Sequence, residues 1–511
     1  MAVLADIADL MGGKAEQVLY LALLLLAYPL SLVHRFLIPS ATGRHVFGLA
    51  CGLLFAWTAF QYDIVHFFAT ATGVYCLCRF VPGKTAPILA LLFALFYLSA
   101  GHLWRMYEAH TDRHWSSPQM LITIKITSFA WSYYDGQRPA ESLSESQKAR
   151  AIQKLPSLLE YFSYIFFFAG FLTGPCPEFK EYKDFVDRSL FKAEGGKIPE
   201  GSYFAATRQL MMGLLCLPLH FVYQYVHEGY TVTDEFYQHN FFWKYGYMIV
   251  SAEIGFYKYY VVFFLGEGAC ILSGLGYNGR DKQGRVQWDR VLMLKFFPFK
   301  LAQDPSTLAA NWNIPSANWL KRYVYVRLLP QRPAKGDTSS EPVEEKQKSS
   351  QMQKMLPMFA TFFVSAFWHG FYPGYYMFFL SLACFAALGG LNRLYIRPFF
   401  LEEDGKTPKY PIKYLYDFMC WFLTFIGLDY HIIVFRTLTF SNGMKAWGSV
   451  YFFPHILGLL CALYYIIIGP PRRRSRKPLQ QQRPSTSTST GKEERAKSTL
   501  VTPTTLMAKE E

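Results

Sequence analysis

The chain has 511 residues, of which 52% are hydrophobic, 18% are aromatic and only 17% are charged, and its formal net charge is +14. An ordinary soluble domain carries roughly 25% charged residues, so the composition argues against a string of soluble domains and favours a membrane-embedded chain. The positive charge does not indicate nucleic-acid binding, because its densest cluster, at 472–477, directly follows an apolar run and contains no aromatic residue.

Several apolar runs reach the length of a membrane-spanning helix once aromatic and small residues are counted. Crossing a bilayer takes about 20 residues of helix, and helices are expected because backbone groups in lipid must be hydrogen-bonded internally. The runs lie at 18–32, 46–62, 85–101, 158–173, 210–226, 247–265, 355–368, 374–390, 415–435 and 448–469. They predict an all-α polytopic membrane protein with roughly nine to twelve transmembrane helices.

These runs define one membrane-embedded domain over residues 1–469. Residues 331–353 are polar and rich in turn formers, and they predict a flexible linker within that domain. Residues 470–511 form a basic, Ser/Thr-rich tail that we expect to be disordered and cytosolic, because positive residues beside a span usually stay in the cytoplasm. Contact of the basic cluster with anionic lipid headgroups is compatible with this topology.

The segment between Cys270 and Pro330 mixes charged residues with Phe, Trp and Pro. It is too polar for ordinary spans and too aromatic for a loose loop. Pro298, Pro305 and Pro315 predict that it is broken into short helices, and amphipathic helices at the membrane interface fit this pattern. Such a stretch in an otherwise apolar chain is where we expect chemistry.

His369, in SAFWHGFYPGYY, ends one apolar run and is followed at once by another. An ionisable residue at membrane depth is costly and is by default a functional candidate, and a neutral imidazole suits the role of general base. A hydrogen-bonded packing histidine is the alternative. Gly370, directly after it, would let the backbone turn or approach a ligand.

Asn313, in AANWNIPSANWL, is a second candidate. A buried carboxamide can donate a hydrogen bond to a developing oxyanion or orient a substrate. An Asn before Ile-Pro also serves as a cap or turn residue, and position alone leaves both readings open.

Six charged residues lie in or near apolar stretches, and such residues normally pair or line a wet cavity, a pattern that fits a transporter as well as an enzyme. They are Lys125, Glu160, Glu253, Lys258, Asp417 and Asp429. No CxxC or HExxH occurs, so no metal site is predicted.

Four stretches in order resemble the membrane-bound O-acyltransferase family over most of the chain. WHG at 368–370 is similar to the segment with that family's histidine, and WNIPSANWL from Trp312 is similar to the segment with its active-site asparagine. KITSFAWSYYDG (125–136) and PSLLEYFSYIFFFAGFLTGPCPEF (156–179) are similar to stretches in its lysophospholipid acyltransferases. Asn313 precedes His369 by 56 residues, with the polar linker between them.

The resemblance implies a helical membrane fold that encloses a reaction chamber, in the endoplasmic reticulum membrane. It implies acyl transfer from acyl-CoA to the free hydroxyl of a lysophospholipid, expected at sn-2, with His369 as general base and Asn313 as the orienting or oxyanion-binding residue. No cofactor is expected, since acyl-CoA is a co-substrate. As substrate-binding residues we predict Trp312, Trp368, Gly370, Lys321 and Arg322, the last two as contacts for CoA phosphates.

Two alternatives stay open from the sequence. One is an enzyme of the same family with a sterol, diacylglycerol or protein acceptor, and the other is a membrane transporter. The expected partners are acyl-CoA, lysophospholipid and membrane lipids. The sequence leaves headgroup preference, acyl-chain preference and oligomeric state open.

Overall fold

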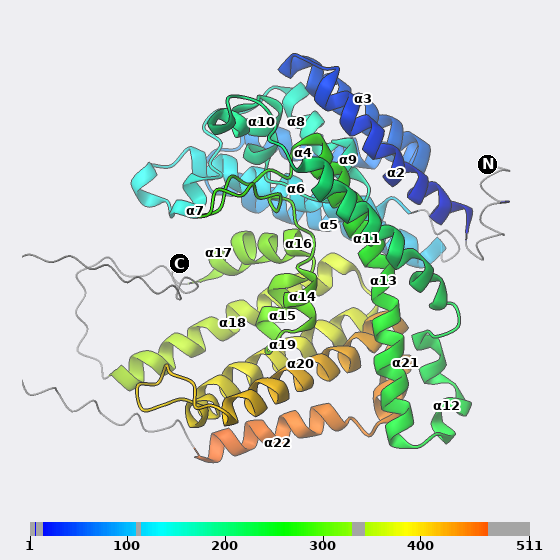
Figure 1. Ribbon diagram of the computed structural model, residues 1–511, viewed down its shortest axis with the longest axis vertical. Helices are drawn as coiled ribbons and strands as arrows, with labels where there is room; N and C mark the ends of the chain where they lie inside the picture. The colour runs from blue at the N-terminus through cyan, green and yellow to red at the C-terminus, as the bar shows by residue number, and fades with distance from the viewer. Residues whose placement is uncertain (1–5, 7–13, 109–113, 330–342, 469–511) are drawn as a thin grey trace, which may run out of the picture.

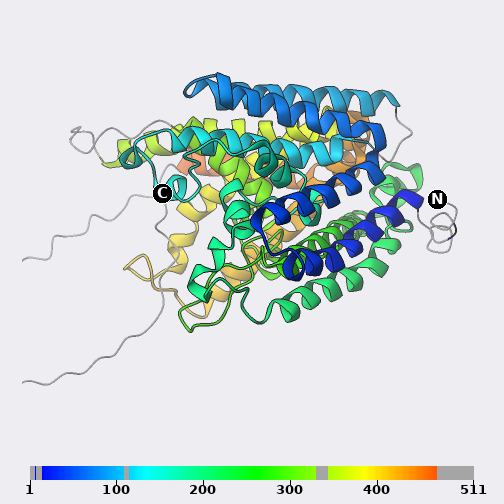
Figure 2. The same cartoon turned by 90° about the horizontal axis from the view of Figure 1, so that it is seen from above.

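The computed structural model describes residue 6 and residues 14–108, 114–329 and 343–468, and these residues form helices and no β-strand. Figure 1 shows an upper group, α2 to α11, and a lower group, α18 to α22, with α14 to α17 between them. Helix α13 runs beside the lower group in that view, and Figure 2 shows most of the long helices running alongside one another. The all-α prediction is confirmed.

The helices of the described residues follow one another in a single series along the chain. They are α2 (Ala15–Phe36), α3 (Ala41–Phe60), η1 (Gln61–Asp63), α4 (Ile64–Phe80), α5 (Thr85–Glu108), α6 (Ser116–Gly136), η2 (Ala140–Ser142), α7 (Glu145–Lys148), α8 (Leu158–Ile165), α9 (Phe168–Phe171), α10 (Phe179–Val186), η3 (Ser189–Glu194), α11 (Ser202–Val222), η4 (Glu228–Val232), α12 (Asp234–Gln238), α13 (Phe241–Ser273), α14 (Phe296–Lys300), α15 (Pro305–Asn311), α16 (Ile314–Trp319), the π-helix η5 (Leu320–Tyr325), α17 (Val326–Leu328), α18 (Val343–His369), α19 (Pro373–Tyr395), η6 (Arg397–Phe400), α20 (Ile412–Thr437), α21 (Phe440–Ser449) and α22 (Phe453–Ile468).

Seven helices in the described part of the chain are long and apolar enough to cross a membrane, or eight if the bent pair α21 and α22 counts as one span. This is fewer than the nine to twelve predicted from the sequence. Helices α3 and α4 together form one 40-residue candidate, and α21 and α22 meet at 78°. The apolar part of α18, Met355–His369, is shorter than a span.

The run at 158–173 was predicted to span and does not. It forms α8 and the four-residue helix α9. Tyr161, Tyr164, Phe166, Phe167 and Phe168 are each at most 2% exposed. The run is apolar because it fills the core between helices, and hydropathy alone does not distinguish a buried segment from one that faces lipid.

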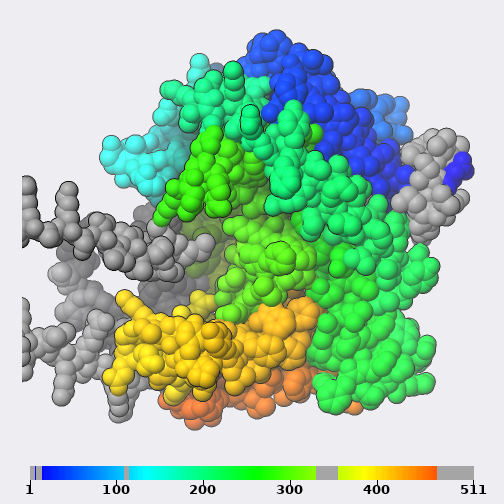
Figure 3. Space-filling model, viewed as in Figure 1, coloured from blue at the N-terminus to red at the C-terminus, as the bar shows by residue number. Residues whose placement is uncertain are grey.

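The proline-rich segment forms short helices as predicted. Pro298 lies inside the five-residue helix α14, Pro305 begins α15, and Pro315 lies in the first turn of α16. A proline in the first turn of a helix loses no hydrogen bond, since that turn has no intrahelical acceptor for its N–H. Figure 3 shows the surface recessed between the upper and lower groups, beside this segment.

The predicted linker 331–353 overlaps the start of a helix. Helix α18 begins at Val343, so residues 343–353 are helical, while 331–342 and the predicted tail 470–511 lie outside the described residues. The C-terminal ends of α17 and α22 and the N-terminal end of α18 lie on the same side of the molecule, at the left of Figure 1.

Candidate active site

His369 is the last residue of α18, and its ring orientation is fixed by its own helix. Its Nδ1 lies 2.7 Å from the carbonyl oxygen of Ser365, one turn earlier. A carbonyl oxygen only accepts hydrogen bonds, so Nδ1 carries the proton and Nε2 presents a lone pair. Within the described residues Nε2 makes no hydrogen bond, and it is therefore available to accept a proton.

Aromatic rings surround the His369 imidazole. The ring centroids of Tyr375, Phe379 and Phe435 lie 5.8, 4.9 and 5.3 Å from it. Tyr375 and Phe379 come from α19, and Phe435 comes from α20. An imidazole in such surroundings is partly desolvated, and His369 is half-buried. An acyl chain placed beside the His369 imidazole would meet apolar surface.

Asn313 precedes α16 and has left-handed backbone angles, φ 42° and ψ 58°. Asparagine adopts this conformation more readily than most residues with a side chain. The backbone N–H of Ile314 donates to the Met293 carbonyl at 3.0 Å, and the N–H of Lys295 donates to the Asn311 carbonyl at 3.1 Å. A short pairing of 293–295 with 311–314 therefore fixes the direction of the chain at Asn313.

Glu267 anchors this pairing to α13. Its side chain is 1% exposed. One carboxylate oxygen accepts from Gln209 Nε2 at 2.5 Å, and the other accepts from the backbone N–H of Met293 at 3.2 Å. A continuous chain of hydrogen bonds thus runs from α11 through Glu267 and Met293 to Ile314, next to Asn313.

Helix α6 connects the segments that carry the two candidates. Trp319, at the end of α16, donates from Nε1 to Thr127 Oγ1 at 2.9 Å. Trp368, which precedes His369, donates from Nε1 to the Met120 carbonyl at 3.0 Å. The two tryptophan rings lie 5.9 Å apart. The segments of Asn313 and His369 therefore pack side by side on one helix.

Asn313 and His369 make no hydrogen bond with each other in the described structure, although their immediate surroundings adjoin. Trp312 packs among five aromatic rings, of which Phe256 and Phe299 are nearest at 5.0 Å. Trp312 belongs to the same hydrophobic cluster as Phe379 and Phe435, the rings beside His369. The segments that carry the two candidates therefore border one apolar interior.

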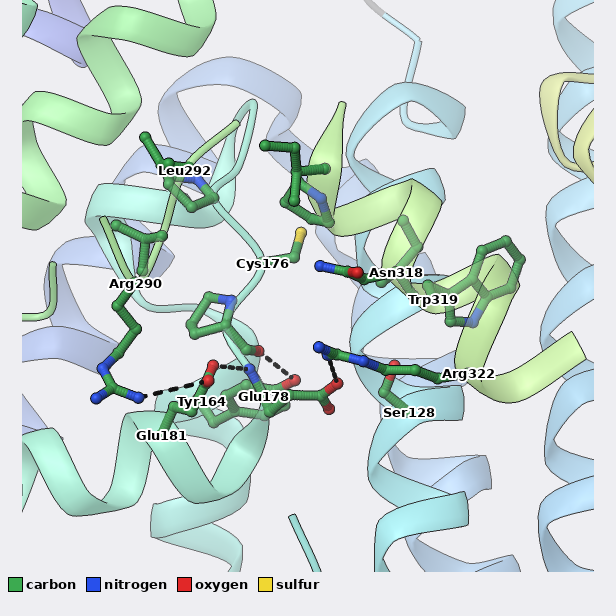
Figure 4. Close-up of a pocket in the computed structure, with 16 residues that line it drawn as sticks. Ser128, Tyr164, Cys176, Glu178, Glu181, Arg290, Leu292, Asn318, Trp319 and Arg322 are labelled. Atoms are coloured by element: carbon green, nitrogen blue, oxygen red, sulfur yellow. Dashed lines mark hydrogen bonds and ion pairs between the residues drawn. The ribbon is translucent and has the colours of Figure 1, made fainter. Parts of the chain in front are cut away.

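A pocket of about 80 Å³ opens beside α16, lined by Ile314, Asn318, Trp319 and Arg322 on one side and by the loop at Cys176 on the other. Figure 4 shows Cys176 and Asn318 on facing walls, with the ion pairs Arg322–Glu178 and Arg290–Glu181 to one side. The distances in these pairs are 3.0 and 3.6 Å. Because Trp319 also contacts Trp368, the inner wall of this pocket adjoins the segment of His369.

Electrostatics in the pocket are set by Glu178. Burial raises the pKa of its carboxyl, while the neighbouring guanidinium of Arg322 opposes that rise. Tyr323 also donates to Glu178, at 3.0 Å. Burial raises the pKa of the Cys176 thiol to about 11, so this cysteine is protonated at neutral pH and is a weak nucleophile.

The predicted substrate-binding residues fall in different places. Arg322 lines the pocket, but Lys321 is exposed and does not. Trp312 and Trp368 are engaged in packing, as described above. Gly370 has φ 121°, a conformation that favours glycine, and it packs directly on the ring of His102.

Most of the intramembrane ions have partners in the structure. Lys125 donates to the carbonyls of Tyr164 and Ile165, at 3.1 and 3.0 Å. The carboxylates Glu160, Glu253 and Asp417 form ion pairs with Lys183, Lys300 and Lys413. Asp429 has Glu253, Lys300 and Arg436 as charged neighbours. Both carboxylate oxygens of Asp429 and one of Glu253 are buried and make no hydrogen bond within the described residues, whereas Lys125, Glu160 and Asp417 belong to structural pairs.

Sequence reasoning missed His102 and Glu267. Each lies in or at the end of an apolar run, and an ionisable residue at that depth is the signal that could have identified it. The partner of His102, Trp368, is remote in the sequence, and the partner of Glu267, Met293, lies beyond a turn. The spacing of residues along the chain therefore did not reveal either contact.

Comparison with known proteins places the chain in a family. Residues 103–340 and 341–430 match the family model described as MBOAT, membrane-bound O-acyltransferase family. The chain is 31% identical to a lysophospholipid acyltransferase of Schizosaccharomyces pombe over 472 residues, 90% of this chain and 89% of the relative. It is 30% identical to membrane-bound glycerophospholipid O-acyltransferase 2 of Mus musculus, over 82% and 78% of the two chains. It is 27% identical to lysophospholipid acyltransferase 1 of Arabidopsis thaliana, over 91% and 98%.

The candidate membrane spans of the described residues and the match to the family model together identify a multi-pass membrane acyltransferase. The chain belongs to the membrane-bound O-acyltransferase family. The family resemblance derived from the WHG and WNIPSANWL segments is confirmed.

We predict that Glu267→Leu lowers acyl-transfer activity at least tenfold and lowers the thermal unfolding temperature. The change leaves the buried donors of Gln209 and Met293 without an acceptor, which costs about 1–3 kcal/mol for each group, and it loosens the chain at Asn313. Activity and thermal unfolding of the purified protein in detergent are the measurements.

Glu267→Gln is the matched control. Its carbonyl can accept from Met293 and its amide can donate to Gln209, so both properties should stay near wild type. Wild-type activity in Glu267→Leu would show that this anchor does not hold Asn313.

Proposed function

We propose that this protein transfers a fatty acyl chain from acyl-CoA to the free hydroxyl, at sn-2, of a lysophospholipid in the endoplasmic reticulum membrane. The relatives from Schizosaccharomyces pombe and Arabidopsis thaliana, which are named lysophospholipid acyltransferases, support a lysophospholipid acceptor. The observation that carries the proposal is the tautomer of His369. Its proton is held on Nδ1 by the Ser365 carbonyl, which leaves Nε2 with a lone pair that can accept a proton.

The reaction needs a base because a neutral alcohol attacks a thioester slowly. Nε2 of His369 takes the hydroxyl proton as the oxygen attacks the thioester carbonyl carbon. The tetrahedral intermediate then expels the CoA sulfur, and the imidazolium returns the proton to give CoA as a thiol. One C–O bond forms, one C–S bond breaks, and His369 ends neutral. General-base assistance of this kind contributes about 10²–10⁴-fold.

Asn313 would stabilise the oxyanion or orient the acceptor hydroxyl. Removing one oxyanion donor typically costs about 10²–10³ in kcat. Its side chain makes no hydrogen bond within the described residues, so its amide is free to donate to a substrate. The left-handed backbone and the pairing with Met293 preorganise it, which is what electrostatic stabilisation of a transition state requires.

The pocket beside α16 is the proposed entrance for acyl-CoA. It is lined by Arg322 of η5, the helix that directly precedes α17, and we expect the end of α17 to lie on the cytosolic side, where acyl-CoA is available. Arg290 and Arg322 are guanidinium groups suited to the phosphates of CoA. Both are paired with glutamates in the structure, so phosphate binding would exchange one anionic partner for another.

The transporter alternative is less well supported. A transport pathway needs ionisable groups that face a wet route, whereas Lys125, Glu160 and Asp417 are paired with neighbours and Glu253 is paired with Lys300 through one carboxylate oxygen.

An acceptor panel tests the function. Purified protein in nanodiscs receives radiolabelled oleoyl-CoA with lysophosphatidylcholine, -ethanolamine, -serine, -inositol and lysophosphatidic acid in competition, and with cholesterol and diacylglycerol as rival acceptors. We expect label in phospholipid, with one CoA released for each acyl chain transferred. Label found only in sterol ester or triacylglycerol would show that the acceptor is not a lysophospholipid. No release of CoA with any acceptor of the panel would refute the proposed acyl transfer.

We predict that His369→Ala abolishes acyl transfer while expression and membrane insertion are retained, and that Asn313→Ala lowers kcat at least tenfold. The reasons are the loss of the base and of the preorganised donor. Initial rates of CoA release measure both. Undiminished activity in His369→Ala would refute its role as base, and a near-wild-type rate in Asn313→Ala would remove that residue from the site.

We predict that Cys176→Phe raises the KM for oleoyl-CoA at least fivefold, with the acceptor KM within about twofold of wild type. A phenyl ring would fill a pocket of about 80 Å³. Cys176→Ser preserves the volume and should retain wild-type kinetics, because the protonated thiol has no catalytic part. An unchanged donor KM in Cys176→Phe would place the CoA entrance elsewhere.

A further inference from the structure

His102 lies in α5 and contacts the segment of His369 from outside the recognised motifs. Its side chain is 4% exposed, and its Nε2 lies 3.0 Å from the carbonyl oxygen of Trp368. Because that oxygen only accepts, Nε2 of His102 carries the proton and donates. The peptide group that receives this hydrogen bond is the one that joins Trp368 to His369.

The end of α18 needs such a donor. The last carbonyl groups of a helix have no intrahelical partner, and unsatisfied carbonyls are costly inside a membrane domain. The chain turns away at once, since the Gly370 N–H bonds back to the Ala366 and Phe367 carbonyls, each at 3.2 Å. The Trp368 carbonyl therefore obtains its partner from another helix, 266 residues away in sequence.

Gly370 gives an independent indication that this contact is tightly specified. Its φ is 121°, and a Cβ atom at this position would lie 3.1 Å from Cγ of His102. The backbone after His369 therefore passes directly over the imidazole of His102. The peptides on both sides of His369 are fixed by one buried ring, one through a hydrogen bond and one through contact.

We infer that His102 is a positioning residue for acyl transfer: it holds the last turn of α18 so that Nε2 of His369 faces the reacting hydroxyl. This inference rests on the proposed function. The ring of His369 has two restraints, its own bond to Ser365 and the backbone direction that His102 fixes. Without the second, the last turn can fray, and the base moves with it. A misplacement of about 1 Å can cost about 10² in rate.

The experiment compares His102→Leu with His102→Gln. Leucine removes the donor, whereas the glutamine amide can reach the Trp368 carbonyl in place of Nε2. With radiolabelled oleoyl-CoA and lysophosphatidylcholine, we expect kcat of His102→Leu to fall at least tenfold while both KM values stay within about twofold. His102→Gln should recover most of the lost kcat. If His102→Leu yields no folded protein, His102→Phe takes its place, since it keeps a ring without a donor.

His34→Leu is the matched control. It replaces another buried histidine of a membrane-spanning helix, packed between the rings of Phe167 and Phe185 and away from His369. Its kcat should be that of wild type. A tenfold loss there as well would show a general effect of losing a buried histidine and would overturn the inference.

Three results distinguish a failure of the proposed function from a failure of the role assigned to His102. An inactive wild-type protein on this substrate pair and on the rest of the panel defeats the proposed function itself. Active wild type with His102→Leu at normal kcat defeats only the role of His102. A His102→Gln variant as slow as His102→Leu also defeats it, because the hydrogen bond would then not be the cause.

Discussion

The arrangement of the site depends on the polar side chains of one buried helix. Helix α6 lies inside the helical domain, and most of its residues are buried. Polar groups buried in a membrane protein must find partners, since lipid supplies none. Several of those of α6 find them in the segments that carry the candidate site. The hydrogen bonds are Thr127 with Trp319, Ser132 with Tyr323, Asp135 with Arg327 and the Met120 carbonyl with Trp368.

This constraint explains how two residues on separate helices are brought to one region. If α16 slipped by one residue, Trp319 would lose its acceptor, and if α18 slipped, Trp368 would lose its own. The register of α16 and α18 against α6 is therefore set by directional hydrogen bonds in addition to apolar packing. Apolar packing alone would tolerate a shift of one helix along another. The final adjustments come from Glu267 at the Asn313 end and from His102 at the His369 end, both buried and both reaching backbone groups.

Part of this arrangement could be predicted from the sequence. Prolines interrupt the segment after Met293, so short helices followed directly from the lack of a proline N–H. His369 stood out because an ionisable residue is costly at membrane depth, and Asn313 stood out because a carboxamide can donate to an oxyanion and because its segment is similar to the family's asparagine segment. The run at 158–173 was counted as a span because aromatic residues such as Phe166 and Phe168 are apolar whether they face lipid or fill a core. His102 was overlooked because its partner, a backbone carbonyl 266 residues away, has no sequence signature.

The end of α18 that carries His369 is the end that other helices hold in place. At 1.5 Å per residue, the 27 residues from Val343 to His369 span about 40 Å. The helix begins on the side where α17 ends, and its other end is fixed by His102, Ser365 and α6. The imidazole of His369 therefore sits at the end of a long helix that is fastened at that end by contacts from α5 and α6.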